Sequence, residues 1–232
     1  MRTPGTIAIL AAWLCLGGAA PAAERPVVVE LYTSQGCAAC LTANQAANQL
    51  AQRKGLLVLA LPVDYWDYLG WKDTYARPAF AARQRAYART LGRRGVSTPQ
   101  VIVDGAFQGP GRRRARVEAL IAQARESQAE APEMLVREDG RVAIGSGRPA
   151  KAGADVWLVR FDPRPRRVVV RKGENAGKTV VQRNVVRQIA RLGDWTGKPA
   201  VYRLPAGRAP TLRAYVLLQA KSGRIMGVLP LT

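Results

Sequence analysis

The sequence predicts an α/β domain followed by a mostly β, sandwich-like domain. Before residue 132, apolar runs of strand length alternate with segments whose apolar residues recur at helical spacing, which is typical of an α/β domain. After residue 132, short apolar segments are separated by regular turn signals, which favours a small β-sandwich. A proline at 132 follows the last helical pattern, so we predict domains at 24–131 and 132–232.

Residues 1–23 are expected to form a signal peptide that is removed on export. Arg2 precedes an apolar run from Ile7 to Leu16, and small residues follow up to Ala23. The run is too short to cross a bilayer comfortably, so we expect no transmembrane segment after cleavage. The mature protein is then expected to be periplasmic or secreted, with an uncleaved N-terminal anchor as the alternative.

The elements of the first domain are predicted from periodicity and turn signals. Strands are expected at 27–32, 56–63, 100–103 and 106–107, with one helix from the cysteine pair to Gly55 and further helices at 78–94 and 112–126. Four aromatic residues lie within 65–71. We expect them to pack on the sheet as a lid, with an exposed recognition ledge as the alternative.

The elements of the second domain are predicted to be short strands. A hairpin is expected between 134–136 and 142–144, because Glu138-Asp139-Gly140 is a turn signal. Further strands are expected at 155–161 and 168–171 around a turn at 163–165, and at 212–219 paired with 224–229. The segment 184–192 fits either a strand or a helix.

Composition excludes several kinds of chemistry. The chain has no His, which rules out a Ser-His-Asp triad, a Cys-His pair, His-ligated zinc and a His general base. It has 36 Lys and Arg against 16 Asp and Glu, a net charge of +20. Residues 24–131 hold 15 basic and 9 acidic side chains, and residues 132–232 hold 20 and 7.

A positive charge of this size attracts anionic partners such as the cell-envelope surface. We expect a solvated surface without a dedicated partner, with binding to the anionic envelope as the alternative. No nucleic-acid partner is expected, because the protein is predicted to be exported and has no recognised binding motif.

The chemistry-bearing motif is Cys37-Ala38-Ala39-Cys40, which holds the only cysteines left after signal removal. Its spacing lets both sulfurs meet, so the pair can cycle between dithiol and disulfide. A structural disulfide is the alternative, although so short a loop gains little entropy from closure. Cu(I) binding by the two thiols is a second alternative. No cofactor and no metal is predicted, since a zinc site lacks its other ligands.

The pair opens a predicted helix, which assigns different roles to the two thiols. Unpaired N–H groups and the positive end of the helix dipole stabilise a thiolate on Cys37, which we expect to be the more exposed and the attacking sulfur. Cys40, one turn further on, is expected to resolve the mixed disulfide.

The element order, with Thr98-Pro99 directly before the strand at 100–103, resembles the thioredoxin fold. The resemblance implies a cis Pro99 facing the cysteines, with the Thr98 backbone free to pair with a bound peptide strand. It also places Glu30 where thioredoxins carry a buried acid that handles the proton of the resolving cysteine. A sheet-edge or capped carboxylate is the alternative role for Glu30.

Longer strings resemble the exported bacterial thioredoxin-like family known as domain of unknown function 1223. They lie at 30–37, 63–67, 70–73, 83–88, 174–175, 177 and 184–187. The resemblance implies a fold and export but no established activity. Leu41 departs from the family pattern, which has proline after the second cysteine.

Two functions follow from these observations. The first is an exported thiol-disulfide oxidoreductase that acts on protein thiols or disulfides through Cys37 and Cys40. The alternative is a non-enzymatic envelope-binding or scaffold protein with a structural disulfide and a basic β-domain.

Overall fold

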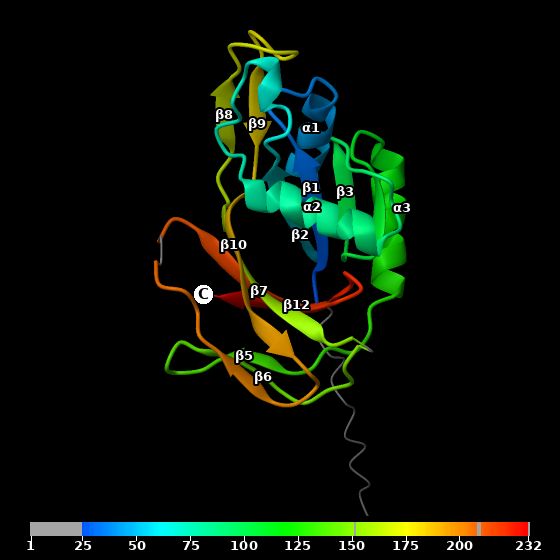
Figure 1. Cartoon of the computed structure of the whole chain (residues 1–232), viewed down its shortest axis with the longest axis vertical. Coiled ribbons are helices and arrows are strands. Elements are labelled where there is room, and N and C mark those ends of the chain that lie inside the picture. The colour runs from blue at the N-terminus through cyan, green and yellow to red at the C-terminus, as the bar shows by residue number, and fades with distance from the viewer. Residues whose placement is uncertain (1–24, 151, 208–209, 232) are drawn as a thin grey trace, which may run out of the picture.

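A computed structural model describes residues 25–150, 152–207 and 210–231 (Figure 1). The predicted signal peptide, 1–23, lies outside the described residues. The protein is a mixed α/β structure with one large mixed sheet and few helices. This agrees with the predicted combination of α/β and β-rich segments.

The large sheet has eight strands in the order β13-β12-β7-β10-β2-β1-β3-β4 (Figure 1). Its strands are β1 Val27–Thr33, β2 Leu56–Pro62, β3 Gln100–Val103, β4 Phe107–Pro110, β7 Ala154–Asp162, β10 Val185–Trp195, β12 Arg213–Ala220 and β13 Ile225–Leu231. β2 runs parallel to both β1 and β10, and all other neighbours are antiparallel. β1 is buried along its whole length, as expected for a β-branched strand in the middle of a covered sheet.

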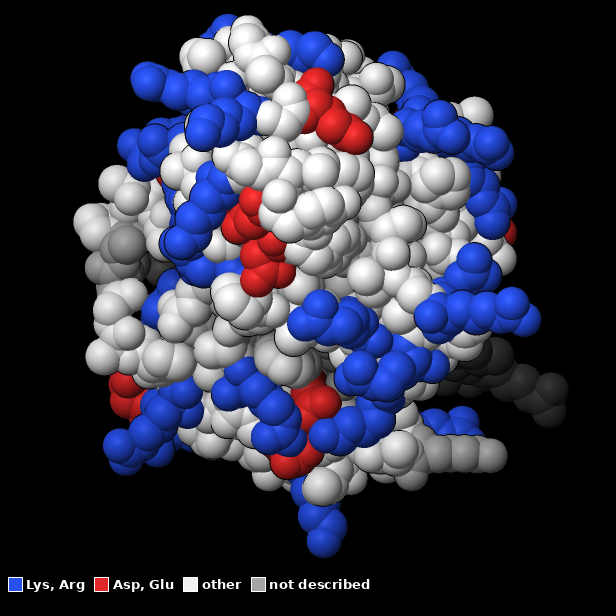
Figure 2. Space-filling view, turned by 45° about the horizontal axis from the view of Figure 1, so that its top comes forward, with Lys and Arg blue, Asp and Glu red and all other residues white. Residues whose placement is uncertain are grey.

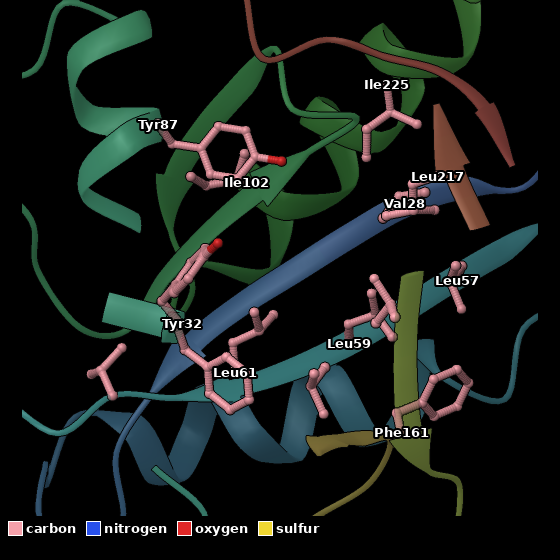
Figure 3. Close-up of a cluster of buried hydrophobic side chains, with 14 of the residues drawn as sticks. Val28, Tyr32, Leu57, Leu59, Leu61, Tyr87, Ile102, Phe161, Leu217 and Ile225 are labelled. Atoms are coloured by element: carbon pink, nitrogen blue, oxygen red, sulfur yellow. The ribbon is translucent and has the colours of Figure 1, made fainter. Parts of the chain in front are cut away.

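Three α-helices cover the two faces of the sheet: α1 Cys40–Leu50, α2 Pro78–Thr90 and α3 Arg114–Glu126. Side chains alternate between the faces along β1. Val29 and Leu31 pack with α1 and α3, whereas Val28 and Tyr32 pack on the side of α2 (Figure 3). A short 3-10 helix, η1 (Asp67–Leu69), precedes α2.

Strands from beyond residue 132 join the sheet formed by the first half of the chain. Asn184 makes this junction: its carbonyl accepts the Ala60 N–H at 3.0 Å, and its side chain donates to the Val58 carbonyl at 2.8 Å. Phe161 and Leu217 consequently share one apolar cluster with Tyr32 (Figure 3). The hydrogen-bonded sheet therefore runs across the predicted boundary, because β10 occupies the edge of β2 that would otherwise be open.

Two smaller sheets complete the fold. β5 Met134–Val136, β6 Val142–Ile144 and β11 Ala200–Tyr202 form a three-stranded sheet in the order β11-β6-β5. Its buried face shares an apolar cluster with Trp195, Val156 and Leu218 of the large sheet, which is a local sandwich. β8 Arg166–Val169 and β9 Thr179–Gln182 form a hairpin that stands beside α1.

Most local predictions are confirmed, with informative exceptions. The hairpin of β5 and β6, the pairing of β12 with β13 and the strand at 100–103 occur as predicted. The ambiguous segment 184–192 is strand β10. The strand predicted at 168–171 is β8, which pairs with the unpredicted β9 rather than with β7. β11 was also not predicted.

The aromatic residues within 65–71 are partly packed, as predicted for a lid, and partly exposed, as the alternative of a recognition ledge requires. Tyr65 and Trp66 pack against the apolar cluster beneath α2, as expected of a lid. Tyr68, in contrast, is 80% exposed. The reason is positional, since Tyr68 lies within η1, which has no buried residue.

Candidate functional site at the Cys37–Cys40 disulfide

Cys37 and Cys40 form a disulfide at the start of α1, with their Cα atoms 5.3 Å apart. This pairing is compatible with the predicted CxxC motif. Ala38 and Ala39, between the cysteines, are exposed. Cys37 and Cys40 are both buried, at 1% and 0% exposure, so the expected greater exposure of Cys37 is not seen.

Residues before Cys37 are held by the segment that follows η1. The Gln35 N–H donates to Asp73 Oδ2 at 2.7 Å. Gln35 Oε1 accepts from Trp71 Nε1 at 3.0 Å and from the Thr74 hydroxyl at 3.1 Å. These contacts fix the backbone that leads into the cysteine pair.

Asp73 is a titratable group beside the cysteine pair. We call Gln35, Asp73, Glu174 and Asn175, which hold the backbone around Cys37, the clamp. Burial raises its pKa from an ordinary value of 3.8 to about 6. Hydrogen bonds from the N–H groups of Gln35 and Tyr75 partly oppose this increase, and the nearby carboxylate of Asp67 adds to it. The acid therefore changes charge within a physiologically relevant range of pH.

The loop between β8 and β9, residues 170–178, covers the disulfide. Fully buried Asn175 donates through Nδ2 to the carbonyls of Gln35 and Cys37, both at 2.9 Å. Glu174 Oε2 accepts the Ala38 N–H at 2.8 Å. A carboxylate thus accepts a backbone N–H at the start of the helix, although these N–H groups were predicted to be free to stabilise a Cys37 thiolate.

Thr98 and Pro99 lie close to the start of α1, because they line the same groove as Ala39. Their peptide bond is cis, as the resemblance to thioredoxins implies. Both residues line a groove of about 680 Å³ that Ala39 also lines. Among the described residues, neither the N–H nor the carbonyl of Thr98 has a hydrogen-bond partner, and its buried hydroxyl has none.

Glu30 lies apart from the cysteines. It is 1% exposed and points to the face of β1 that α2 covers, opposite to α1. Its Oε1 accepts from Arg83 Nε at 2.8 Å. Arg83 also donates to Gln219 Oε1 at 3.0 Å and to the Tyr87 hydroxyl at 2.9 Å. Thr98 and Pro99 therefore share a groove with Ala39, which lies between the two cysteines, although neither cysteine lines it. Glu30 belongs to a buried network on the other face of the sheet.

Sequence reasoning assigned no role to the clamp residues Gln35, Asp73, Glu174 and Asn175. All four lie in the strings that carry the family resemblance, so a signal was present. Nothing in the local pattern indicates that Asn175 contacts Cys37, which is 138 residues away.

No group of three or more His, Cys, Asp or Glu is arranged to hold a metal ion within the described ranges. In the same part of the chain, every helix is too short or too polar to cross a membrane.

The fold and site define a mixed α/β protein with a covered CxxC disulfide. The chain belongs to the family described as protein of unknown function (DUF1223), whose profile matches residues 28–219. A crystal structure of a protein from Agrobacterium tumefaciens is similar, with 33% sequence identity and a TM-score of 0.73. The match covers 90% of this chain and 96% of that protein. No curated protein matches the chain.

Proposed function

We propose that this protein is an exported, thioredoxin-like protein that exchanges disulfides with other proteins through Cys37 and Cys40. The observation that carries the proposal is a disulfide at the start of α1 beside a groove lined by Thr98 and Pro99. The strand order β2-β1-β3-β4, with α1 and α3 on one face and α2 on the other, supports a thioredoxin-like arrangement.

The reaction moves two electrons from the cysteine pair to a substrate disulfide. The Cys37 thiolate attacks one substrate sulfur, the substrate S–S bond breaks, and one substrate thiolate leaves. The Cys40 thiol then loses its proton to solvent and attacks Cys37 in the mixed disulfide. The second substrate thiolate leaves and the Cys37–Cys40 bond forms. The reverse sequence oxidises a substrate dithiol.

Cys37 is 1% exposed, so a substrate sulfur reaches it only after a local opening. We propose that the loop at 170–178 is the part that opens, because Asn175 of this loop is hydrogen-bonded to the Cys37 carbonyl. Loops with few buried apolar contacts open at low free-energy cost. Of residues 171–179, only Asn175 is buried, which is consistent with such opening.

The proposal is tested by turnover of an insulin-type disulfide substrate in the presence of dithiothreitol. We expect turnover by the mature protein, loss of turnover in Cys37→Ser and trapped mixed disulfides in Cys40→Ser. Ser222→Ala, at an exposed turn, serves as a control variant. Full turnover by Cys37→Ser, or none by the unmodified protein, contradicts the proposal.

Burial of both cysteines favours a second candidate, a non-enzymatic envelope-binding protein with a structural disulfide. The charge distribution is consistent with it, since Lys and Arg spread over the face in Figure 2 while Asp and Glu form a few small groups. Salt-sensitive binding to anionic vesicles without any disulfide exchange would support this candidate.

Export is tested separately from the chemistry. The signal pattern predicts that the exported protein begins at Ala23 or Glu24. Intact mass of the protein recovered from the cell exterior or periplasm measures this directly. A mass that includes Met1 contradicts cleavage.

A further inference from the structure

The charged residues that line the groove beside the disulfide are all positive. Its charged lining side chains are Arg93, Arg112 and Arg116, and no acidic residue lines it. All three arginines are exposed, and none forms an ion pair with a described residue. This differs from the arginines near β7 and β10, which share Asp162, Asp155 or Asp194 with neighbouring cations.

Electrostatic repulsion disfavours the arginines at the start of α3 when no partner is bound. Arg112, Arg113, Arg114 and Arg116 cluster at the start of α3, and the first turn of this helix has no acidic residue. The positive end of the helix dipole and the cations repel one another there. An anionic partner would relieve that repulsion and gain bidentate hydrogen bonds from the guanidinium groups.

The wall of the groove that Thr98 and Pro99 form has unpaired backbone groups. The N–H and carbonyl of Thr98 have no partner within the described residues, and Gln100 begins strand β3 directly after Pro99. An extended peptide can therefore add its main chain along this wall. Ala39 places the start of α1 on the same groove, so a bound chain passes close to the cysteine pair.

We propose that this groove binds extended polypeptide segments with Asp or Glu side chains next to the target cysteine. The inference rests on the proposed thiol-disulfide function and names its substrate class. The main chain of the segment pairs with Thr98, and its carboxylates meet Arg93, Arg112 and Arg116. Acidic protein substrates are thereby selected over neutral and basic ones.

The test measures binding and turnover separately, using the oxidised mature chain for binding. The binding probes are three labelled, cysteine-free peptides of ten residues. They are identical except at four positions, which are all Glu in the first peptide, all Gln in the second and all Lys in the third. By fluorescence anisotropy we expect the Glu peptide to bind roughly tenfold more tightly than the Gln peptide, and the Lys peptide more weakly than both. Turnover is followed with the same three peptides, each carrying a short intramolecular disulfide.

Two triple variants separate the groove from the net charge of the protein. Arg93→Glu/Arg112→Glu/Arg116→Glu is expected to abolish the preference for the Glu peptide. The matched control, with the same change in net charge, substitutes Glu at the exposed residues Arg148, Arg203 and Arg213, and should keep at least half of the binding. A thermal melt of each variant verifies that it is folded.

The outcomes distinguish the two proposals. Equal turnover of all three peptides overturns the acidic preference but leaves disulfide exchange standing. Selective binding of the Glu peptide without turnover of any peptide supports the groove and contradicts disulfide exchange. Two further results would contradict the proposal that the groove binds acidic peptides. One is an equal loss of peptide binding in both triple variants. The other is displacement of the peptide by phosphatidylglycerol vesicles that bind more tightly than the peptide does.

Discussion

Glu174 places a carboxylate on the N–H of Ala38, directly after Cys37. Negative charge at this end of α1 is favourable for the helix dipole but repels a thiolate on Cys37. Removing that charge while keeping an acceptor should increase the thiolate fraction of the reduced protein.

We therefore predict that Glu174→Gln raises the alkylation rate of Cys37 about threefold to tenfold at pH 7, measured by mass spectrometry in a Cys40→Ser background. Glu138→Gln, in the exposed turn between β5 and β6, is the control and should leave the rate unchanged. An unchanged or slower rate in Glu174→Gln would show that its carboxylate does not act on Cys37.

Asp73 gives the clamp a dependence on pH. Its pKa is about 6 in the folded protein against 3.8 ordinarily, so the folded state binds a proton more tightly than the unfolded state. The resulting stabilisation is complete below about pH 4 and is lost as pH rises through 6. A shift of this size corresponds to up to about 3 kcal/mol.

Asp73→Asn should remove this component of the pH dependence, measured by urea denaturation at intervals between pH 4 and 7. Asp139→Asn is a matched control, because Asp139 is exposed and hydrogen bonds from Arg141 lower its pKa to about 2. In the control, the free energy of unfolding should still decrease between pH 4 and 6. If the same decrease persists in Asp73→Asn, another group is responsible for it.

At the level of elements, the proposed opening of the disulfide involves the hairpin of β8 and β9. Asn175 is its only buried residue between 171 and 179 and makes two hydrogen bonds to the backbone around Cys37. Asn175→Ala is predicted to accelerate reduction of the disulfide by a bulky thiol about tenfold, followed by quenched alkylation. Asn48→Ala tests the specificity of this effect.

Asn48 anchors β9 to α1 through the Val181 carbonyl, at 2.9 Å, without contacting the cysteines. We expect a smaller acceleration in Asn48→Ala than in Asn175→Ala. Equal rates in the unmodified protein and in Asn175→Ala would show that the loop does not limit access.

Elements with a strong local pattern were predictable, and those defined by distant partners were not. Glu138-Asp139-Gly140 between two apolar triplets indicates the hairpin of β5 and β6 without further information. β9 and β11 have four and three residues, and their strand conformation depends on pairing with β8 and β6. The continuation of the sheet from β2 to β10 depends on Asn184, which is more than 120 residues from its partners.

The same distinction applies to the site. The cysteine spacing predicted the disulfide, and the resemblance to the thioredoxin fold implied the cis bond at Thr98-Pro99. The position of Glu30 in the sequence did not show which face of β1 it occupies, and Arg83 binds it on the side away from α1. Glu174 and Asn175 cover Cys37 only because the second half of the chain folds onto the first.

At the scale of the whole molecule, a buried polar network joins the two halves. Arg83 connects Glu30 of β1 to Gln219 of β12, and both charged side chains are less than a tenth exposed. Breaking a buried pair leaves an uncompensated charge, which costs about 3–5 kcal/mol. We predict this loss in the free energy of unfolding for Arg83→Ala, measured by urea denaturation.

Exposed Arg85 on the same helix is the control, and Arg85→Ala should cost less than about 0.5 kcal/mol. Replacing both partners, Arg83→Met with Glu30→Leu, should recover part of the loss because no buried charge is left. A double variant less stable than Arg83→Ala would contradict this account of the pair.

The reduction potential of Cys37 and Cys40 shows whether the pair exchanges disulfides with other proteins. The mature protein is equilibrated in glutathione and dithiothreitol buffers, and the reduced fraction is counted by alkylation and intact mass. Exchange predicts a potential between about −270 and −120 mV, the range of cycling thiol-disulfide proteins. A potential below about −300 mV, typical of structural disulfides, would contradict it.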